Sequence, residues 1–192
     1  GALYSHFGYS EFSRQMIGVA CGMPLSDIVS GGVQVGWYNE RSKGEYNNVQ
    51  IIVPEAGIIV RASENVKIGV HIFNPVPNSL RKSDIPTRLR TGAGIILSKD
   101  LTAGVETEMG TGDKLILRTG FEYAAAKKIL VRGGFSTESS SFSFGIGYQS
   151  GQAMIDFAFS THERLGITSS VSIIFEMKSI NSKMPLWKLK RK

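Results

Sequence analysis

The sequence predicts an all-β protein, an antiparallel up-and-down transmembrane β-barrel of about twelve strands. First, apolar and polar side chains alternate with period two between Lys114 and Glu176. Second, no run approaches the roughly 18 apolar residues that a transmembrane helix needs, and barrel strands do not produce such runs. Third, the connections between the predicted strands alternate between short and long. These patterns favour a sheet that crosses a membrane with its strands.

The alternation assigns the side chains of this segment to two faces. The apolar face carries Leu115, Leu117, Phe121, Tyr123, Ile129, Val131, Phe135, Phe142, Phe144, Ile146, Tyr148, Ile155, Phe157, Phe159, Val171, Ile173 and Phe175. The other face carries Arg118, Gly120, Glu122, Arg132, Gly134, Ser141, Ser143, Gly145, Gly147, Gln149, Asp156, Ser170 and Ser172. In a membrane barrel the apolar face would meet lipid, whereas in a soluble β-sandwich it would form the core. Periodicity alone leaves both arrangements open.

Twelve strands are predicted, at residues 3–10, 14–23, 28–38, 51–63, 66–73, 88–98, 101–109, 115–124, 129–136, 142–149, 152–160 and 166–176. The connections at 24–27, 64–65, 99–100, 125–128 and 150–151 are short, and those at 39–50, 74–87, 110–114, 137–141 and 161–165 are longer. Outer-membrane barrels have short periplasmic turns and longer outer loops. Pro54 cannot donate to a strand ladder, so a bulge or a strand start near Glu55 is expected there.

A structural charge ladder is predicted in the barrel lumen. Its members are Arg90, Glu106, Glu108, Arg118, Glu122, Arg132 and Asp156. If hairpin turns lie at 99–100 and 110–114, Arg90 falls opposite Glu108 and Glu106 falls opposite Arg118. Glu122 is expected diagonal to Arg132 on the next strand, and opposite charges in such positions attract. A register shift by one residue would move the arginines into lipid, so the register should be firmly set.

The 192 residues fit one domain, predicted as a β-barrel at 1–177 with a basic tail at 178–192. The tail supplies much of the net charge of +6 and is expected to be a solvated end on the periplasmic side. Cys21 is the only cysteine, so no internal disulfide can form, and its position predicts a lipid-facing side chain. The chain opens without a signal peptide, so we expect either a mature form or a fragment.

No catalytic, metal or cofactor site is predicted. The three histidines, His6, His71 and His162, lie far apart in the sequence and lack ligands at metal spacing. Ser160, His162 and Glu163 are interpreted as one solvated turn rather than a catalytic triad. The glycine-rich segment 110–114 lacks the spacing of a phosphate-binding loop.

Four segments resemble the outer-membrane barrels of the FadL superfamily, and within it the PorV-like and PorQ-like branch associated with type IX secretion. They are EAGIIVRASENVKIGVHIFNP (55–75), IPTRLRTGAGIILSKDLTAGVETE (85–108), LRTGFEYAAAKKILVRGGF (117–135) and FSFGIGYQSGQAMIDFAFSTHERLGITSSVSIIF (142–175). The resemblance implies about fourteen strands, and the N-terminal region that contributes a plug and the opening strands is not present. The chain is therefore expected to be an incomplete fourteen-stranded barrel, a fragment without signal peptide, plug and first strands.

The resemblance implies a non-enzymatic protein of the bacterial outer membrane. The main hypothesis is a PorV-like barrel that contacts outer-membrane lipid and binds secretion-system or envelope proteins, with no nucleic acid as partner. The first alternative is a FadL-like transporter of hydrophobic small molecules, which would need an apolar pocket within the predicted polar face. The second alternative is a soluble β-sandwich binding module.

Overall fold

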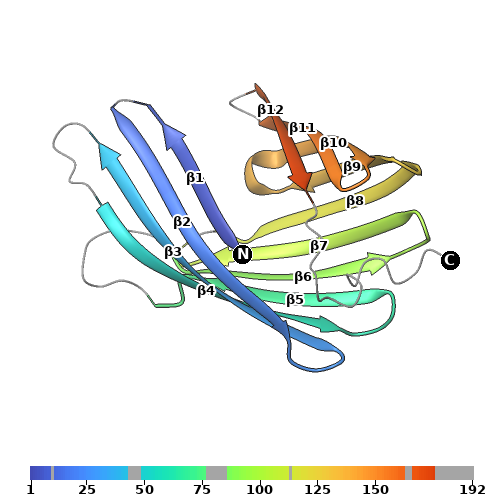
Figure 1. Ribbon diagram of the computed structural model, residues 1–192, viewed down its shortest axis with the longest axis horizontal. Coiled ribbons are helices and arrows are strands. Elements are labelled where there is room, and N and C mark those ends of the chain that lie inside the picture. Colours follow the sequence, from blue (N-terminus) through green and yellow to red (C-terminus); the bar gives the residue numbers. More distant parts are fainter. Residues whose placement is uncertain (10, 43–48, 77–85, 113, 163–165, 176–192) are drawn as a thin grey trace. The chain divides into compact units, whose positions relative to one another are not determined.

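The computed structural model is a single antiparallel sheet of twelve strands in the order of the chain (Figure 1). It describes residues 1–9, 11–42, 49–76, 86–112, 114–162 and 166–175. The strands are β1 (Ala2–Gly8), β2 (Phe12–Pro24), β3 (Val29–Ser42), β4 (Val49–Arg61), β5 (Val66–Phe73), β6 (Arg88–Ile96), β7 (Leu101–Gly110), β8 (Ile116–Ala126), β9 (Ile129–Ser136), β10 (Ser141–Ser150), β11 (Ala153–His162) and β12 (Gly166–Phe175). A short 3-10 helix, η1 (Glu138–Ser140), precedes β10.

The predicted up-and-down strand architecture is confirmed. All twelve predicted strands occur, and the largest difference is in β3, which continues beyond its predicted end at Tyr38 to Ser42. The order begins at β1 and ends at β12, so the described pairings do not include one that would close a barrel. The predicted tail at 178–192 lies outside the described residues, and the division at 177 stays a prediction. In the described ranges, no helix is long and apolar enough to cross a membrane.

The expected irregularity at Pro54 does not occur, because β4 passes through this residue with an unbroken register against β3. The Pro54 carbonyl accepts the Asn74 amide at 2.9 Å. In a hydrogen-bonded antiparallel pair the second bond would run from an amide at position 54 to the Asn74 carbonyl, and proline cannot make it. The Thr87 hydroxyl takes that place and donates to the Asn74 carbonyl at 2.7 Å. The ladder therefore tolerates a proline inside a strand.

Three of the short turns share one serine-based structure. In the turns after β2, β4 and β6, the amides of Ser26, Ser63 and Ser98 each donate to the carbonyl three residues later. The hydroxyl of each serine accepts the amide two residues later, at 3.4, 3.3 and 3.3 Å. Serine favours turns because its hydroxyl satisfies such local amides. The sequence therefore uses the same serine turn in the three hairpins β2–β3, β4–β5 and β6–β7.

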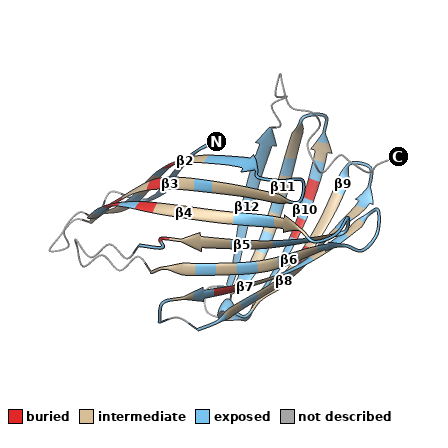
Figure 2. Cartoon of the chain, turned by 90° about the horizontal axis from the view of Figure 1, so that it is seen from below, coloured by how far each residue is buried: buried red, intermediate tan, exposed pale blue. Residues whose placement is uncertain are grey.

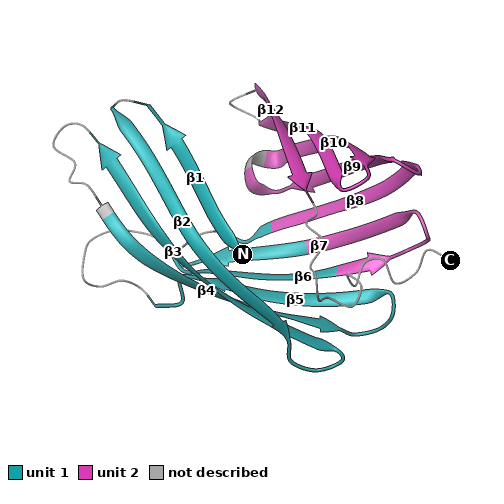
Figure 3. Ribbon diagram, viewed as in Figure 1, with its two compact units in different colours: residues 1–93, 106–116 teal, residues 94–105, 117–192 magenta. Residues whose placement is uncertain are grey.

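The chain divides into two compact units (Figure 3). Unit 1 comprises residues 1–93 and 106–116, and unit 2 comprises residues 94–105 and 117–192. In unit 1 the sheet runs from β1 to β5 with continuous registers, for example Met16 opposite Tyr38 and Tyr38 opposite Ile51. In unit 2 the registers link β8 to β12, with Glu122 opposite Arg132.

Few residues of the sheet are buried (Figure 2). Most of the large apolar side chains are exposed, whereas the polar residues Asn39, Asn74 and Glu108 are buried. Phe144 and Phe157 are 63% and 49% exposed, whereas Glu108 is 3% exposed. Along β8 exposure alternates, with Leu117, Phe121 and Tyr123 exposed and Arg118 and Glu122 half-buried. Monomeric soluble proteins rarely expose apolar surface on this scale. The β-sandwich alternative is therefore not supported, since the described strands form one sheet whose aromatic residues do not build a core.

Candidate functional site

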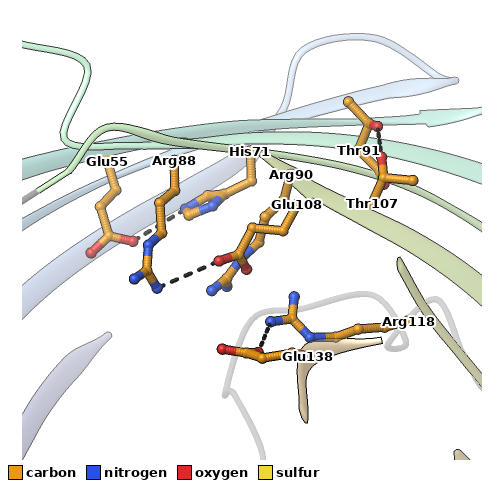
Figure 4. A network of polar contacts seen from close by, with 9 residues as sticks. All are labelled: Glu55, His71, Arg88, Arg90, Thr91, Thr107, Glu108, Arg118 and Glu138. Atoms are coloured by element: carbon orange, nitrogen blue, oxygen red, sulfur yellow. Dashed lines mark hydrogen bonds and ion pairs between the residues drawn. The ribbon is translucent and has the colours of Figure 1, made fainter. Parts of the chain in front are cut away.

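The polar face of unit 1 carries a row of ionisable side chains from consecutive strands. Glu55 lies on β4, His71 on β5, Arg88 and Arg90 on β6, and Glu108 on β7 (Figure 4). The Glu55 carboxylate accepts a hydrogen bond from Gln34 Nε2 at 2.9 Å and lies 3.1 Å from His71 Nε2. Its side chain is 13% exposed, so these two neighbours replace much of its hydration.

Glu108 is the most buried carboxylate of this row, and two arginines hold it. Arg90 Nε donates to Glu108 Oε2 at 2.7 Å, and Arg88 Nη1 lies 3.4 Å from Oε1 (Figure 4). Both arginine side chains are 42% exposed, so a desolvated carboxylate is held by two guanidinium groups that remain partly hydrated. The structure thus brings together Arg90 and Glu108 of the predicted ladder. Arg88 was missed, although it lies two residues from Arg90 and shares its face.

Two further ladder residues lie in different units. Glu106 is half-buried on β7 in unit 1, and Arg118 lies on β8 in unit 2. Their predicted pairing therefore stays a prediction. Within unit 2, Arg118 Nη2 donates to Glu138 Oε2 at 2.8 Å (Figure 4). Glu138 belongs to the 3-10 turn after β9, where the sequence analysis expected only a loop.

Arg132 is the centre of the polar network in unit 2. Its Nε donates to Glu122 Oε2 at 2.7 Å on β8, and its Nη1 donates to Asp156 on β11. Glu122 lies directly opposite Arg132 rather than diagonal to it, because the β8–β9 register aligns the two residues. The path to Asp156 crosses β10 above Gly145 and Gly147, which are both buried. The Arg132 guanidinium therefore links β8, β9 and β11, and it passes over β10 where that strand has only glycines on the polar face.

The two faces remain distinct at Thr91 and Thr107. These residues lie on β6 and β7, one position away from Arg90 and Glu108, and therefore on the apolar face. Their hydroxyl oxygens are 2.8 Å apart and hydrogen-bonded (Figure 4). Mutual pairing of two hydroxyls lowers the cost of placing polar groups in an apolar environment.

The polar face of unit 1 also holds an apolar cluster that the sequence analysis missed. We define the apolar cluster as Met16, Tyr38, Ile51, Val53 and Phe73, from strands β2 to β5. Val53 is 0% exposed and Ile51 is 7% exposed, and among the described residues they are the buried hydrophobic core. The Tyr38 and Phe73 rings meet edge to face with centroids 6.3 Å apart. Val53 and Glu55 are two residues apart on β4 and share a face.

Polar pairs border the apolar cluster along the strands. Arg14 donates to Glu40 Oε2 from Nε at 3.0 Å and from Nη2 at 2.7 Å, one row beyond Met16 and Tyr38. Gln34 and Glu55 pair one row beyond Gly36 and Val53 on the other side. A side chain at position 36 would meet Tyr38 at 3.2 Å and Met16 at 3.6 Å, so Gly36 leaves room for both. The result is an apolar area enclosed between two charged rows.

The other sequence-derived sites remain separate. Cys21 is exposed and pairs with Val33 in the β2–β3 register, on the apolar face. His71 contacts Glu55, whereas His6 and His162 lie on β1 and β11. Glu163 and Asp113 lie outside the described residues. Within the described part of the chain, no group of three histidine, cysteine or acidic side chains lies at metal-binding distance.

Solved structures with the same architecture are membrane channels and porins. No protein-family model matches the chain, and no curated protein matches it. The structure is similar to CymD, described as a monoaromatic hydrocarbon channel, with TM-score 0.63, 11% identity, 93% of this chain and 78% of CymD covered. It is similar to the toluene transporter TbuX of Ralstonia pickettii, with TM-score 0.61, 14% identity and coverages of 84% and 65%.

A third neighbour is a triple mutant of the Rhodopseudomonas blastica porin, with TM-score 0.51, 9% identity, 88% of this chain and 82% of the porin covered. These identities are low, so the likeness shows the fold alone, that of an outer-membrane β-barrel. The neighbours are porins and transport channels rather than enzymes.

Proposed function

We propose that this chain forms the strand framework of an outer-membrane β-barrel that conducts small hydrophobic molecules. The apolar cluster is the observation that carries this proposal. Tyr38 and Phe73 are half-buried and keep apolar surface accessible beside the buried Ile51 and Val53, and an apolar solute gains about 0.8 kcal/mol for each methylene group that leaves water there. Aromatic side chains such as Tyr38 and Phe73 are frequent in the lining of small-molecule sites.

The proposal favours the FadL-like alternative over the PorV-like hypothesis. The predicted inward face was polar and charged, which counted against transport. The apolar cluster removes that objection within unit 1, since four of its side chains lie between the Arg14–Glu40 and Gln34–Glu55 pairs and the fifth, Phe73, lies opposite Glu55. The similarity to CymD and TbuX, whose descriptions name a monoaromatic hydrocarbon channel and a toluene transporter, supports the same direction. A role in type IX secretion has no comparable support.

The location follows from the exposed apolar face. Its side chains, including Phe144, Ile146 and Phe157, would contact the acyl chains of the outer membrane. Charged residues would then lie on the opposite face, away from lipid, where their hydrogen bonds replace hydration. A periplasmic position of the tail at 178–192 remains part of this proposal.

The test compares hydrocarbon uptake by cells that carry the chain behind an outer-membrane signal sequence with uptake by cells that carry the empty vector. The key variant is Ile51→Thr with Val53→Thr, which adds hydroxyls to the apolar cluster. The matched control is Val33→Thr with Val35→Thr, on the apolar face of β3, where both side chains are exposed. We expect the wild type and control to raise toluene uptake severalfold, and the key variant to lose most of this increase.

Heat-modifiable gel migration would establish that each variant is folded and inserted to the same level. Uptake equal to the empty vector by folded wild-type protein would rule out the transport function. Equal uptake by the key variant and the wild type would show that the apolar cluster does not contact the solute.

A further inference from the structure

We infer that Glu55 determines which hydrophobic solutes the apolar cluster accepts: it favours aromatic molecules with a hydroxyl or amino group and rejects those with a carboxylate. This inference rests on the proposed function and specifies the chemical class of its solute. Its basis is the position of one desolvated carboxylate at the border of the apolar cluster in unit 1.

Glu55 adjoins the apolar cluster on two sides. It lies directly opposite Phe73 in the β4–β5 register and two residues from Val53 on the same face of β4. Its side chain is 13% exposed, so it is accessible from the polar face but has lost much of its hydration. A solute in contact with the Tyr38 and Phe73 rings would therefore bring its polar substituent close to the Glu55 carboxylate.

The carboxylate has capacity for one more donor. Gln34 Nε2 donates to Oε1 at 2.9 Å, and His71 Nε2 lies 3.1 Å from Oε2. An ionised carboxylate offers about four lone-pair sites, so these two neighbours leave acceptor sites for a ligand. They also fix the orientation of the carboxylate, which reduces the ordering cost when a ligand donor arrives.

The sign of the local charge decides the selectivity. A phenol or aniline can donate to Glu55 and form a charge-assisted hydrogen bond, whereas a ligand carboxylate would meet a like charge in a partly desolvated site. Arginines two strands away from β4 on either side are already paired: Arg14 on β2 pairs with Glu40, and Arg88 and Arg90 on β6 pair with Glu108. A solute at the apolar cluster would therefore interact mainly with the charge of Glu55, which lies opposite Phe73.

The test measures binding of toluene, p-cresol and p-toluate, three aromatic molecules of similar size. Equilibrium dialysis would compare lipid nanodiscs containing the full chain with empty nanodiscs, which corrects for partition into lipid. For the wild type we expect p-cresol to bind roughly tenfold or more tightly than p-toluate, the effect of one hydrogen bond to a charged group. Toluene should fall between the two.

The variant Glu55→Gln keeps the size and an acceptor oxygen but removes the charge. We expect it to reduce the preference for p-cresol to roughly threefold or less, mainly by tighter binding of p-toluate. The matched control is Glu40→Gln, the same change at the opposite border of the apolar cluster, where the carboxylate is held by Arg14. The control should keep the wild-type preference.

The outcomes separate this inference from the proposed function. Loss of the preference in Glu55→Gln and its retention in Glu40→Gln would support the inference. Equal binding of p-cresol and p-toluate by the wild type, or an unchanged preference in Glu55→Gln, would overturn it. Toluene binding above that of empty nanodiscs would still support a hydrophobic conduit in that case. If none of the three molecules binds to the folded protein, both proposals fail.

Discussion

Arg132 on β9 forms an ion pair with Asp156 on β11, although strand β10 lies between them. The guanidinium can cross β10 because the residues beneath it are Gly145 and Gly147. A Cβ atom on Gly147 would lie 2.5 Å from Asp156 Oδ1 and 3.3 Å from Arg132 Nη1. The absence of a side chain at this position is therefore a condition of the ion pair.

We predict that Gly147→Ala lowers the stability of the sheet, whereas Gly145→Ala does not. A Cβ at position 145 would make its nearest contact at 3.4 Å, which is ordinary packing. Both substitutions reduce the entropy of the unfolded chain equally, so their difference reports the ion pair. We expect Gly147→Ala to be less stable than Gly145→Ala by about 1–3 kcal/mol in urea unfolding of the lipid-inserted protein. Equal unfolding midpoints would contradict the prediction.

The two partners of Arg132 should differ in coupling energy. The Asp156 side chain is 13% exposed and that of Glu122 is 45% exposed, so solvent screens the second pair more strongly. Double-mutant cycles would combine Arg132→Met with Asp156→Asn and with Glu122→Gln. We expect a coupling of about 1–3 kcal/mol with Asp156 and below about 1 kcal/mol with Glu122. The reverse order would show that burial does not govern this network.

The single cysteine offers a direct test of which face meets lipid. Cys21 is exposed on the apolar face of β2, and Ala20 lies one residue away on the polar face, opposite Gln34. We expect a fluorophore on Cys21 to be quenched by brominated acyl chains. The same fluorophore on the control variant Ala20→Cys with Cys21→Ser should instead be quenched by iodide from water. Lipid quenching at both positions, or at neither, would contradict the assignment of faces.

Replacing Pro54 in β4 should reduce the destabilising effect of a mutation at Thr87. Thr87→Val removes the hydrogen bond to the Asn74 carbonyl, which we expect to cost about 1–2 kcal/mol of stability. Pro54→Ala restores an amide that can donate to the same carbonyl. The loss caused by Thr87→Val should therefore be smaller in the Pro54→Ala background, as measured by a double-mutant cycle. Additive effects would show that the threonine hydroxyl does not replace the missing amide.

The strands and their faces could be predicted because each segment carries its own period-two pattern. The pairing of Arg90 with Glu108 followed from the turn at 99–100, since that turn fixes the register of the hairpin. The link between Arg132 and Asp156 was harder to predict, because it skips a strand and depends on two glycines.

The apolar cluster could not be predicted from the sequence because of the pattern of residues 51–53. Residues 51–53 form a continuous apolar run, which contains no alternation to distinguish one face from the other. The structure places Ile52, 61% exposed, on the apolar face, and Ile51 and Val53 on the polar face. The remaining members come from three other strands, so only the combined register brings them together.

Because each described strand pairs with its neighbours in the chain, the pairings among the described strands involve no distant segment. A gene segment that encodes two adjacent strands and their turn could be duplicated or deleted while the other ladders keep their partners. The number of strands in such a sheet is thus open to evolutionary change in steps of one hairpin. The serine turns at Ser26, Ser63 and Ser98 suit such a change, because each closes its own hairpin with hydrogen bonds inside the turn.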